Sequence, residues 1–187
     1  MKHSNYFPLA IDSDYSLHEL SVDDFMTLFT ERQEQYFSSS IVVDGTSHLS
    51  ADEIKHVRLR AEAYPKTWRF QWALLYCGEA VGWTYAYQSD HETLYMCNTA
   101  IDPAHRGKGL YARIVQEVIG VARAEGFQLI TSKHHASNSA VLVPKLKAGF
   151  IITGLTLDEK YGLMVLLTYF VDPVRRSLAV RRIGQAE

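Results

Sequence analysis

The sequence predicts one domain with a mixed α/β fold, in which helices flank a sheet. Its 187 residues fit the usual range of roughly 100–200 residues for one domain. Hydrophobic residues make up 47% and charged residues 21%, which excludes disorder for most of the chain. Apolar residues recur at period two in some stretches and at spacings of three and four in others, so strands and helices share the fold. We expect a single domain over 1–187, with its core at about 15–170 and a peripheral segment at 172–187.

The first elements are predicted from alternation and from capping residues. Residues 15–20 alternate apolar and polar, as a half-buried strand does. Ser21 then caps a helix with three residues on one face: Phe25, Met26 and Phe29. A capping box of Ser50 and Glu53 begins a second helix, which we expect to end at Pro65. Its apolar positions recur at helical spacing: Ile54, Val57, Ala61 and Tyr64.

Three strands are predicted next, over 68–76, 81–88 and 93–101, with a turn at Gly78–Glu79 between the first two. Aromatic residues alternate along the second strand at Trp83, Tyr85 and Tyr87. Such a stripe could hold a cation, but large aromatic residues at period two are how sheets build their cores. We therefore expect core packing.

The rest of the chain alternates strands and helices. A helical stripe runs from Leu110 to the neighbourhood of Gly126, and a short buried strand is expected at 127–131. A helix at 138–148 and two last strands follow, at 150–157 and 161–169. Beyond Asp172 an arginine-rich stretch forms either a peripheral helix or a solvated tail.

The loop between the strand at 93–101 and the next helix has the features of an anion site. Gly107 and Gly109 allow tight turns and close approach of a ligand to the backbone, and Arg106 and Lys108 add positive charge. The free N–H groups and the dipole of the following helix face the same point. These features predict a phosphate or pyrophosphate cradle. The spacing fits neither the common nucleotide loop nor the dinucleotide fingerprint.

Two motifs in this order resemble the GNAT superfamily of acetyl-CoA-dependent N-acetyltransferases. Arg106-Gly-Lys-Gly109 resembles its motif A, whose pattern is Gln/Arg-x-x-Gly-x-Gly/Ala. Asn138 followed by Lys147-Ala-Gly149-Phe150 resembles its second motif, in which Asn opens a helix that ends in Lys-x-Gly-Phe. The motifs begin 32 residues apart, and the order of elements over 15–169 is similar to that of the family.

The resemblance implies a mostly antiparallel central sheet that is splayed between the strand ending at Ile101 and the strand around Leu129, with acetyl-CoA in the split. The pyrophosphate would bind the loop and the helix start, and the pantetheine arm would pair with the backbone of Ala100 and Ile101. Asn138 would touch or position that arm. The implied cofactor-binding residues are Ala100, Ile101, Arg106, Gly107, Lys108, Gly109, Leu110, Tyr111 and Asn138.

The chain departs from the family pattern at two positions. The sixth position of motif A, where Gly or Ala is usual, is Tyr111, which must point aside, reshape the pocket or donate a hydrogen bond to the ligand. Many members carry a Tyr seven residues after the Asn as the acid for the leaving thiolate, and this position is Lys145 here. Tyr111 and Lys145 are therefore the candidates for the thiolate partner.

Several histidines are candidates for the base that takes the proton of the amine. The unperturbed pKa of His suits a base acting through water. His134 and His135 lie near the mouth of the expected split, ahead of Asn138, and His91 and Glu92 precede the strand at 93–101. The histidines have no ligand spacing, so we expect no metal.

Composition limits the partners. The formal net charge of −2 argues against general nucleic-acid binding. No apolar run reaches the roughly 20 residues of a membrane span, and the N-terminus lacks the features of a secretory signal, so a cytoplasmic location is expected. A homodimer is compatible with the expected sheet edges.

Three functions remain open from the sequence. The first is an N-acetyltransferase that moves an acetyl group from acetyl-CoA to a primary amine by direct attack in a ternary complex; the amine itself is not identified by the sequence. The second is a weak or inactive acyl-CoA-binding or sensing module, which Lys145 at the usual Tyr position favours. The third is an unrelated phosphate-binding fold, which CoA would not stabilise.

Overall fold

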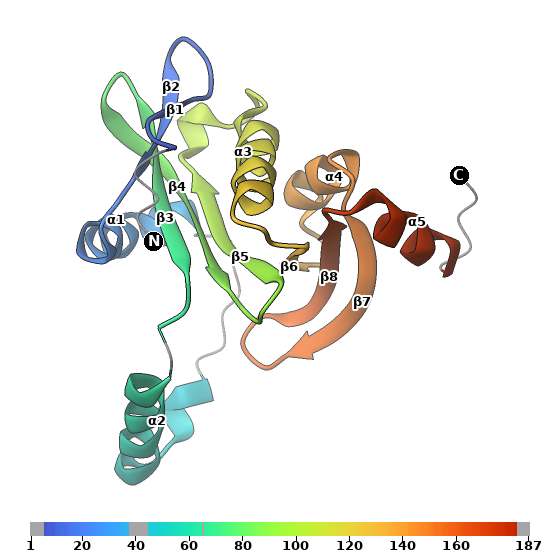
Figure 1. Ribbon diagram of the computed structural model, residues 1–187. Helices are drawn as coiled ribbons and strands as arrows, with labels where there is room; N and C mark the ends of the chain where they lie inside the picture. Colours follow the sequence, from blue (N-terminus) through green and yellow to red (C-terminus); the bar gives the residue numbers. More distant parts are fainter. Residues whose placement is uncertain (1–5, 38–44, 65, 183–187) are drawn as a thin grey trace.

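The computed structural model describes residues 6–37, 45–64 and 66–182 and contains an eight-stranded sheet with helices on both faces (Figure 1). The strand order is β1-β2-β3-β4-β5-β6-β8-β7. Every neighbouring pair is antiparallel except β5 and β6, which are parallel. The strands are β1 Leu9–Ala10, β2 Tyr15–Glu19, β3 Arg69–Tyr76, β4 Glu79–Gln88, β5 Thr93–Ile101, β6 Leu129–His135, β7 Ile151–Asp158 and β8 Gly162–Phe170. The predicted mixed, mostly antiparallel sheet is confirmed.

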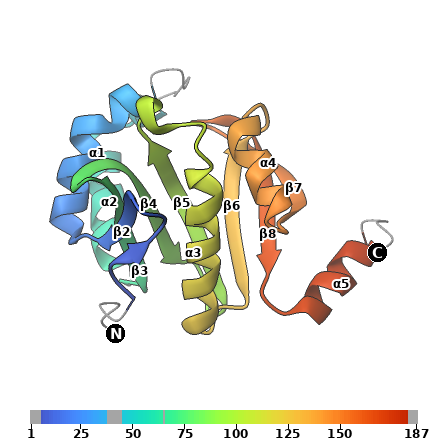
Figure 2. The ribbon, with the colours of Figure 1, turned by 90° about the horizontal axis from the view of Figure 1, so that it is seen from above.

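Helices lie on both faces of the sheet. They are α1 Val22–Tyr36, α2 Ala51–Ala63, α3 Leu110–Ala124, α4 Ser139–Lys147 and α5 Pro173–Arg182, with short 3-10 turns at Gly45–His48 and Pro103–His105. Figures 1 and 2 place α3 and α4 side by side on one face and α1 on the other. Because α3 follows β5 and α4 follows β6, the space between these two helices lies over the boundary between β5 and β6.

That boundary is open over most of its length. β5 and β6 pair only at Thr93–Leu129, Leu94–Ile130 and Tyr95–Thr131. Beyond these positions β5 continues to Ile101 and β6 to His135 without pairing to one another. The other edge of β6 stays paired to β8 as far as His135, so the gap is a split within the sheet. This is the splayed geometry that the family resemblance implied.

A buried cluster that contains aromatic residues lies on each face of the sheet. On the face under α3, Phe70 and Trp72 stack with ring centroids 3.8 Å apart within a large buried cluster that includes Ile114. On the opposite face, Trp83 is fully buried against Tyr36 and other residues of α1. The expectation that Trp83 belongs to the core is confirmed.

Two helical expectations were wrong in part. No residue of α2 is buried, although its capping box forms as predicted, and Val57 is 56% exposed. In Figure 1, α2 stands apart from the sheet, so the helix has its local start signal but no core for its apolar positions. Met26 on α1 is 51% exposed, while Phe25 beside it is buried. The expected stop at Pro65 lies outside the described residues.

Other boundaries differ by small amounts. The first hairpin turns at Cys77 and Gly78, which both have positive φ, rather than at Gly78–Glu79. β6 extends through His135, so the two histidines lie in the strand instead of after it. The arginine-rich C-terminal stretch is a helix, α5, whose Arg175 pairs with Glu92 at 2.7 Å. The short edge strand β1 was not predicted.

Candidate functional site

The loop after β5 leaves its backbone open. Asp102 accepts a hydrogen bond from the N–H of Ala104 at 2.8 Å and starts the turn over Pro103–His105. Gly107 and Gly109 then have φ of +77° and +75°, values that favour glycine. No atom lies within 4 Å of where a side chain would begin at either glycine. The loop therefore offers its backbone to a ligand without obstruction.

The start of α3 has no side chain to bind its N–H groups. Its N-cap is Gly109, which makes no side-chain capping bond, and its first turn holds no acidic residue. The helices α1 and α2 differ, because Ser21 and Ser50 cap them and acidic residues fill their first turns. The α3 start thus keeps unpaired N–H donors and the positive end of the helix dipole, which together suit an anion.

The two cations of the loop fold back onto the protein. Arg106 donates from Nε to the carbonyl of Ile101 at 2.8 Å and from Nη2 to the carbonyl of Tyr36 at 3.1 Å. Lys108 donates from Nζ to the Tyr15 hydroxyl at 3.0 Å, and this hydroxyl shares a 2.7 Å hydrogen bond with Nδ1 of His105. Because both side chains donate to groups of the protein, the loop groups left to contact an anion are its backbone N–H groups.

The end of β5 packs so closely against β4 that the backbone of β5 leaves no space for a side chain at Gly82. A Cβ built on Gly82 of β4 would lie 2.5 Å from the carbonyl oxygen of Ala100. Further back, the register between β4 and β5 shifts, so that Tyr85 pairs with Asn98 and Ala86 with Met96. Cys97 is therefore an extra residue in β5, a bulge of the kind that leaves backbone groups without a partner in the ladder. The bulge lies where the split opens.

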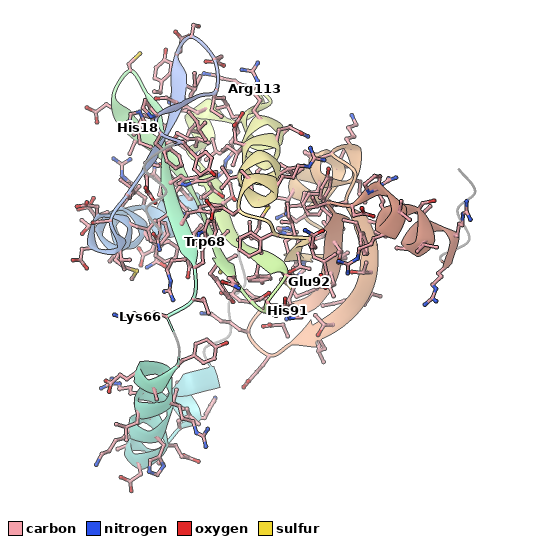
Figure 3. The ribbon with its side chains drawn as sticks, in the orientation of Figure 1. His18, Lys66, Trp68, His91, Glu92 and Arg113 are labelled. Atoms are coloured by element: carbon pink, nitrogen blue, oxygen red, sulfur yellow. The ribbon has the colours of Figure 1, made fainter. Side chains whose placement is uncertain are left out.

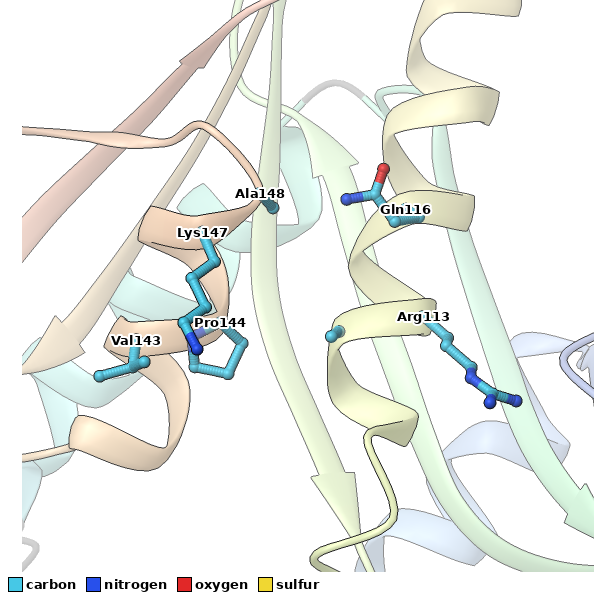
Figure 4. Close-up of a pocket in the computed structure, with 7 residues that line it drawn as sticks. Arg113, Gln116, Val143, Pro144, Lys147 and Ala148 are labelled. Carbon is cyan, nitrogen blue, oxygen red and sulfur yellow. The ribbon is translucent and has the colours of Figure 1, made fainter.

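A hollow of about 400 Å³ lies between α3 and α4, over the split (Figure 4). Arg113 on α3 turns away from it and pairs with Asp12 at 2.7 Å. Lys147 on α4 remains as a cation at its wall. The hollow is lined by Ala112, Arg113, Gln116, Val143, Pro144, Lys147 and Ala148.

Asn138 and Tyr111 lie at the two helix starts that flank the hollow. Asn138 is the N-cap of α4, but its exposed side chain makes no capping bond. Tyr111 packs against the large core cluster, and burial raises the pKa of its phenol. This packing favours the first of the three outcomes expected for Tyr111, in which the side chain points aside.

The neighbouring histidines His134 and His135 face opposite sides of the sheet, because successive strand residues alternate. His134 lies on the side of α4, and its Nε2 is buried without a hydrogen-bond partner among the described residues. Burial and the nearby charge of Lys145 lower the pKa of His134 to about 3. His135 is exposed, and its Nδ1 shares a 2.9 Å hydrogen bond with the Ser137 hydroxyl.

Lys145 of α4, seven residues after Asn138, is fully buried. Its Nζ donates to the Ser132 hydroxyl at 2.8 Å and lies 3.3 Å from Sδ of Met96. Its ammonium group also lies 4.3 Å from the centre of the Phe150 ring. Sequence reasoning missed Ser132 and Met96, since only the fold brings β5, β6 and α4 together at this point.

His91 and Glu92 are remote from the loop. They lie at the start of β5, at the opposite end of the sheet from Arg113 (Figure 3). Two hydrogen bonds from Arg175, of 2.7 and 3.2 Å, occupy the Glu92 carboxylate and lower its pKa. This geometry separates both residues from the open part of the split.

The described ranges, 6–37, 45–64 and 66–182, contain no group of three or more His, Cys, Asp or Glu side chains placed to hold a metal ion. None of their helices has both the length and the apolar character of a membrane span.

Solved structures with the same fold include acetyltransferases with different acceptors. The chain superposes on the yncA protein of Salmonella typhimurium, solved with its cofactor acetyl-CoA, with a TM-score of 0.61 and 15% identity over 86% of this chain and 95% of that one. A ribosomal-protein-S5-alanine acetyltransferase of Vibrio fischeri gives 0.63 and 13% over 86% and 95%. A spermidine N-acetyltransferase of Vibrio cholerae gives 0.60 and 13% over the same shares.

The sequence itself was compared with curated proteins and with family profiles. No curated protein gave a significant match. The profile of the acetyltransferase (GNAT) family matches residues 20–142, which is more than half of the chain and includes the loop, α3, β6 and the start of α4. The protein therefore belongs to the GNAT family of acetyltransferases.

Proposed function

We propose that this GNAT protein transfers an acetyl group from acetyl-CoA to a primary amine, which attacks directly while both substrates are bound. One observation carries the proposal. The open split between β5 and β6 ends beside the uncapped start of α3, and the hollow between α3 and α4 lies over the same split. A long ligand with a phosphate group at one end and an amide-bearing arm fits such a path.

Each part of the path suits a part of acetyl-CoA. The N–H groups of residues 107–111 would bind the pyrophosphate. The backbone of Ala100 and Ile101, beyond the last residue of β5 that pairs with β6, would pair with amides of the arm through groups other than the Ile101 carbonyl, which accepts from Arg106. The Asn138 side chain, which makes no cap bond, would position that arm from α4.

The reaction makes three demands on the protein. The amine must lose its proton, because an alkyl amine has a pKa well above 7. The thioester carbonyl must be polarised, for which the unpaired N–H groups near the β5 bulge are suited. The thiolate must be stabilised as it leaves. His135 suits the base better than His134, whose lowered pKa makes it a weak proton acceptor at neutral pH.

The test combines binding with turnover. Acetyl-CoA should raise the melting temperature, with about 2.7 kcal/mol of added stability at a hundredfold excess over Kd. Release of free thiol should then depend on an added amine. The amine panel contains spermidine and a peptide with an N-terminal alanine, because structural neighbours are named for these acceptors, together with an aminoglycoside and small alkylamines. Absence of stabilisation by acetyl-CoA would overturn the proposal.

A second function is supported by Lys145, which stands where many family members have a Tyr that acts as the general acid. A protein that lost this acid could bind acyl-CoA as a sensing module without turning it over. Stabilisation by acetyl-CoA with no thiol release from any amine would support the module and contradict the enzyme.

The same panel tests the base. His135→Gln should flatten the acidic limb of the pH–rate profile, while Gln substitution of the exposed His91, at the remote end of the sheet, should leave the profile unchanged. An unchanged profile in the His135 variant would remove that residue from the mechanism.

A further inference from the structure

Lys145 is an unusual buried residue. Its side chain has 0% exposure, and lysine is almost never fully buried unless it is paired. The groups around its Nζ are the Ser132 hydroxyl, the Met96 sulfur and the Phe150 ring. None of these three carries a negative charge. An uncompensated ammonium group in such surroundings costs considerable free energy, so its retention needs a reason beyond packing.

The charges around Lys145 do not supply that reason. Burial alone lowers the pKa of Lys145 to about 7, with no carboxylate contributing to the shift. His134 is the titratable group in electrostatic contact with it among the described residues, and its own pKa is lowered to about 3, so it is neutral when Lys145 titrates. The other packed elements contribute Met96 from β5 and Ser132 from β6.

The position of Lys145 points to a partner that is not part of the chain. The last paired residues of β5 and β6 are Tyr95 and Thr131. Met96 and Ser132 are the next residue on each strand, so Lys145 Nζ bridges the two strands at the closed end of the split. The β5 bulge at Cys97 follows directly. A ligand arm that enters the split from the loop would meet Nζ at this closed end.

We propose that Lys145 donates the proton to the leaving thiolate of CoA, in place of the phenol that this chain lacks. This inference rests on the proposed acetyl transfer and assigns its acid. Ser132, which accepts the 2.8 Å hydrogen bond from Nζ, is a positioning residue that aims the ammonium group.

The neutral amine attacks the thioester carbonyl carbon, forming the C–N bond while the carbonyl π electrons move to oxygen. As the carbonyl re-forms, the C–S bond breaks and its electron pair goes to sulfur. Lys145 gives one proton from Nζ to that sulfur, which leaves as the CoA thiol. The nitrogen of the acceptor loses one proton to water or His135, and Lys145 regains one from solvent.

The first experiment measures binding and needs no acceptor. CoA and S-methyl-CoA are titrated into wild-type protein and Lys145→Met by calorimetry at pH 8. We expect the variant to bind CoA about tenfold more weakly and S-methyl-CoA equally well, because the CoA thiol can pass its proton to Nζ and pair with the resulting ammonium group as a thiolate, whereas a methylated sulfur has no proton to give. Equal CoA affinity in both proteins, or the same loss for both ligands, would overturn the sulfur contact.

Methionine is the suitable replacement because it keeps the length of the side chain and removes a buried charge, a change that is often neutral or stabilising. Lys160→Met serves as the matched control, since Lys160 is exposed in the β7–β8 turn. Melting temperatures of both variants no lower than that of the wild type would show that any binding change comes from the lost ammonium group and not from misfolding.

The second experiment uses the pH–rate profile with the panel amine that the wild type acetylates fastest. Lys145→Met should reduce kcat by about 100-fold and remove the alkaline limb of the wild-type profile. Lys145→Tyr should recover part of the loss and carry a new limb near the phenol pKa of about 10. A purely structural role would not move a limb. An unchanged profile in Lys145→Met would refute the assignment.

Absence of acetyl transfer and absence of a proton-donor role for Lys145 give different experimental results. If no amine is acetylated but the CoA and S-methyl-CoA affinities separate as expected, the transfer function fails and the contact of Lys145 with the CoA sulfur stands. If wild type and Lys145→Met acetylate equally, the enzyme stands and the acid is another group. A stable gain of one acetyl group on Lys145 with acetyl-CoA alone would identify it as a nucleophile and overturn the proton-donor role.

Discussion

Single residues in this protein are explained by what surrounds them after folding. Lys145 and His134 are ordinary residue types in the sequence, and burial moves the pKa of each downward, to about 7 and about 3. Arg106 and Lys108 are basic residues of the predicted phosphate-binding loop, yet both donate to groups of the protein itself. The type of a residue gives its possible chemistry, and its neighbours decide which part is used.

The first prediction concerns Gly109 of the loop. Gly109→Ala places a side chain at φ +75°, a conformation that costs an L-residue roughly 1–2 kcal/mol. The loop should shift away from its anion-binding geometry and raise the KM for acetyl-CoA at least tenfold, with a small effect on kcat. Gly126→Ala is the control, because Gly126 has φ +84°, equally open surroundings and a place beyond the C-terminal end of α3, away from the loop. Equal KM effects in both variants would refute a specific role for Gly109.

The buried ammonium gives a pH dependence of stability. The pKa of Lys145 is lowered to about 7 in the folded protein, against about 10.4 when unfolded. Between these values the unfolded state binds more protons, so stability rises with pH, by at most roughly 1.4 kcal/mol per pH unit. Urea unfolding from pH 7 to 10 should show the free energy of unfolding of the wild type rising relative to Lys145→Met. A constant difference over this range would contradict the burial of the charge.

At the scale of elements, local signals start the helices and tertiary contacts give them different weights. Ser21 and Ser50 each accept a hydrogen bond from a backbone N–H at N3, and both helices begin where these residues predict. α1 buries Phe25 and Tyr36 against the sheet, whereas α2 buries none of its residues. Most helical stability in proteins comes from packing, so the two caps should contribute differently to the fold.

The two caps provide a matched pair of variants. Ser21→Ala should lower the global stability by about 1 kcal/mol, because α1 is part of the core. Ser50→Ala should leave the melting temperature unchanged and instead speed the hydrogen exchange of α2. Thermal unfolding and exchange mass spectrometry measure both effects. A global loss from Ser50→Ala as large as that from Ser21→Ala would show that α2 packs on the sheet.

The strands of the sheet provide a second matched pair of variants, at Gly82 and Gly154. Gly82→Ala forces a Cβ to within 2.5 Å of the Ala100 carbonyl oxygen, so β5 must move. We expect a loss of about 1–3 kcal/mol of stability and weaker binding of acetyl-CoA. Gly154→Ala in β7 meets only Leu166 side-chain atoms at 3.8 Å and should be tolerated. Unchanged acetyl-CoA affinity in the Gly82 variant would show that the position of Ala100 is unimportant for the site.

At the scale of the whole molecule, the two edges of the sheet differ, because the edge strand β1 has two residues and the edge strand β7 has eight. β7 is an edge strand, and an edge strand presents unpaired backbone groups. Its outer face carries exposed leucines, with Leu155 67% and Leu157 82% exposed, and Leu163 of β8 lies opposite Leu157 at 49%. An apolar face next to an open edge is typical of a contact between protein chains.

This edge supports the expectation of a homodimer. We predict that two copies associate through β7 and that sedimentation velocity shows a dimer at concentrations of tens of micromolar. Leu157→Lys should give a monomer, because it places a charge in the apolar face. Leu178→Lys on α5, where the replaced leucine is 57% exposed, is the control and should remain dimeric. A wild type that stays monomeric at all concentrations would refute the prediction.

The sequence alone predicted the order of the elements, the anion-binding loop and the family. These features depend on short-range physics: residue period selects strand or helix, serine caps start helices, and glycines permit the φ values that the loop requires. Contacts between distant segments decided the rest. They left α2 without a core, turned Arg106 and Lys108 back onto the protein, and brought Met96, Ser132 and Lys145 together at the end of the split. Burial and charge interaction depend on distance in space, which local spacing along a chain does not specify.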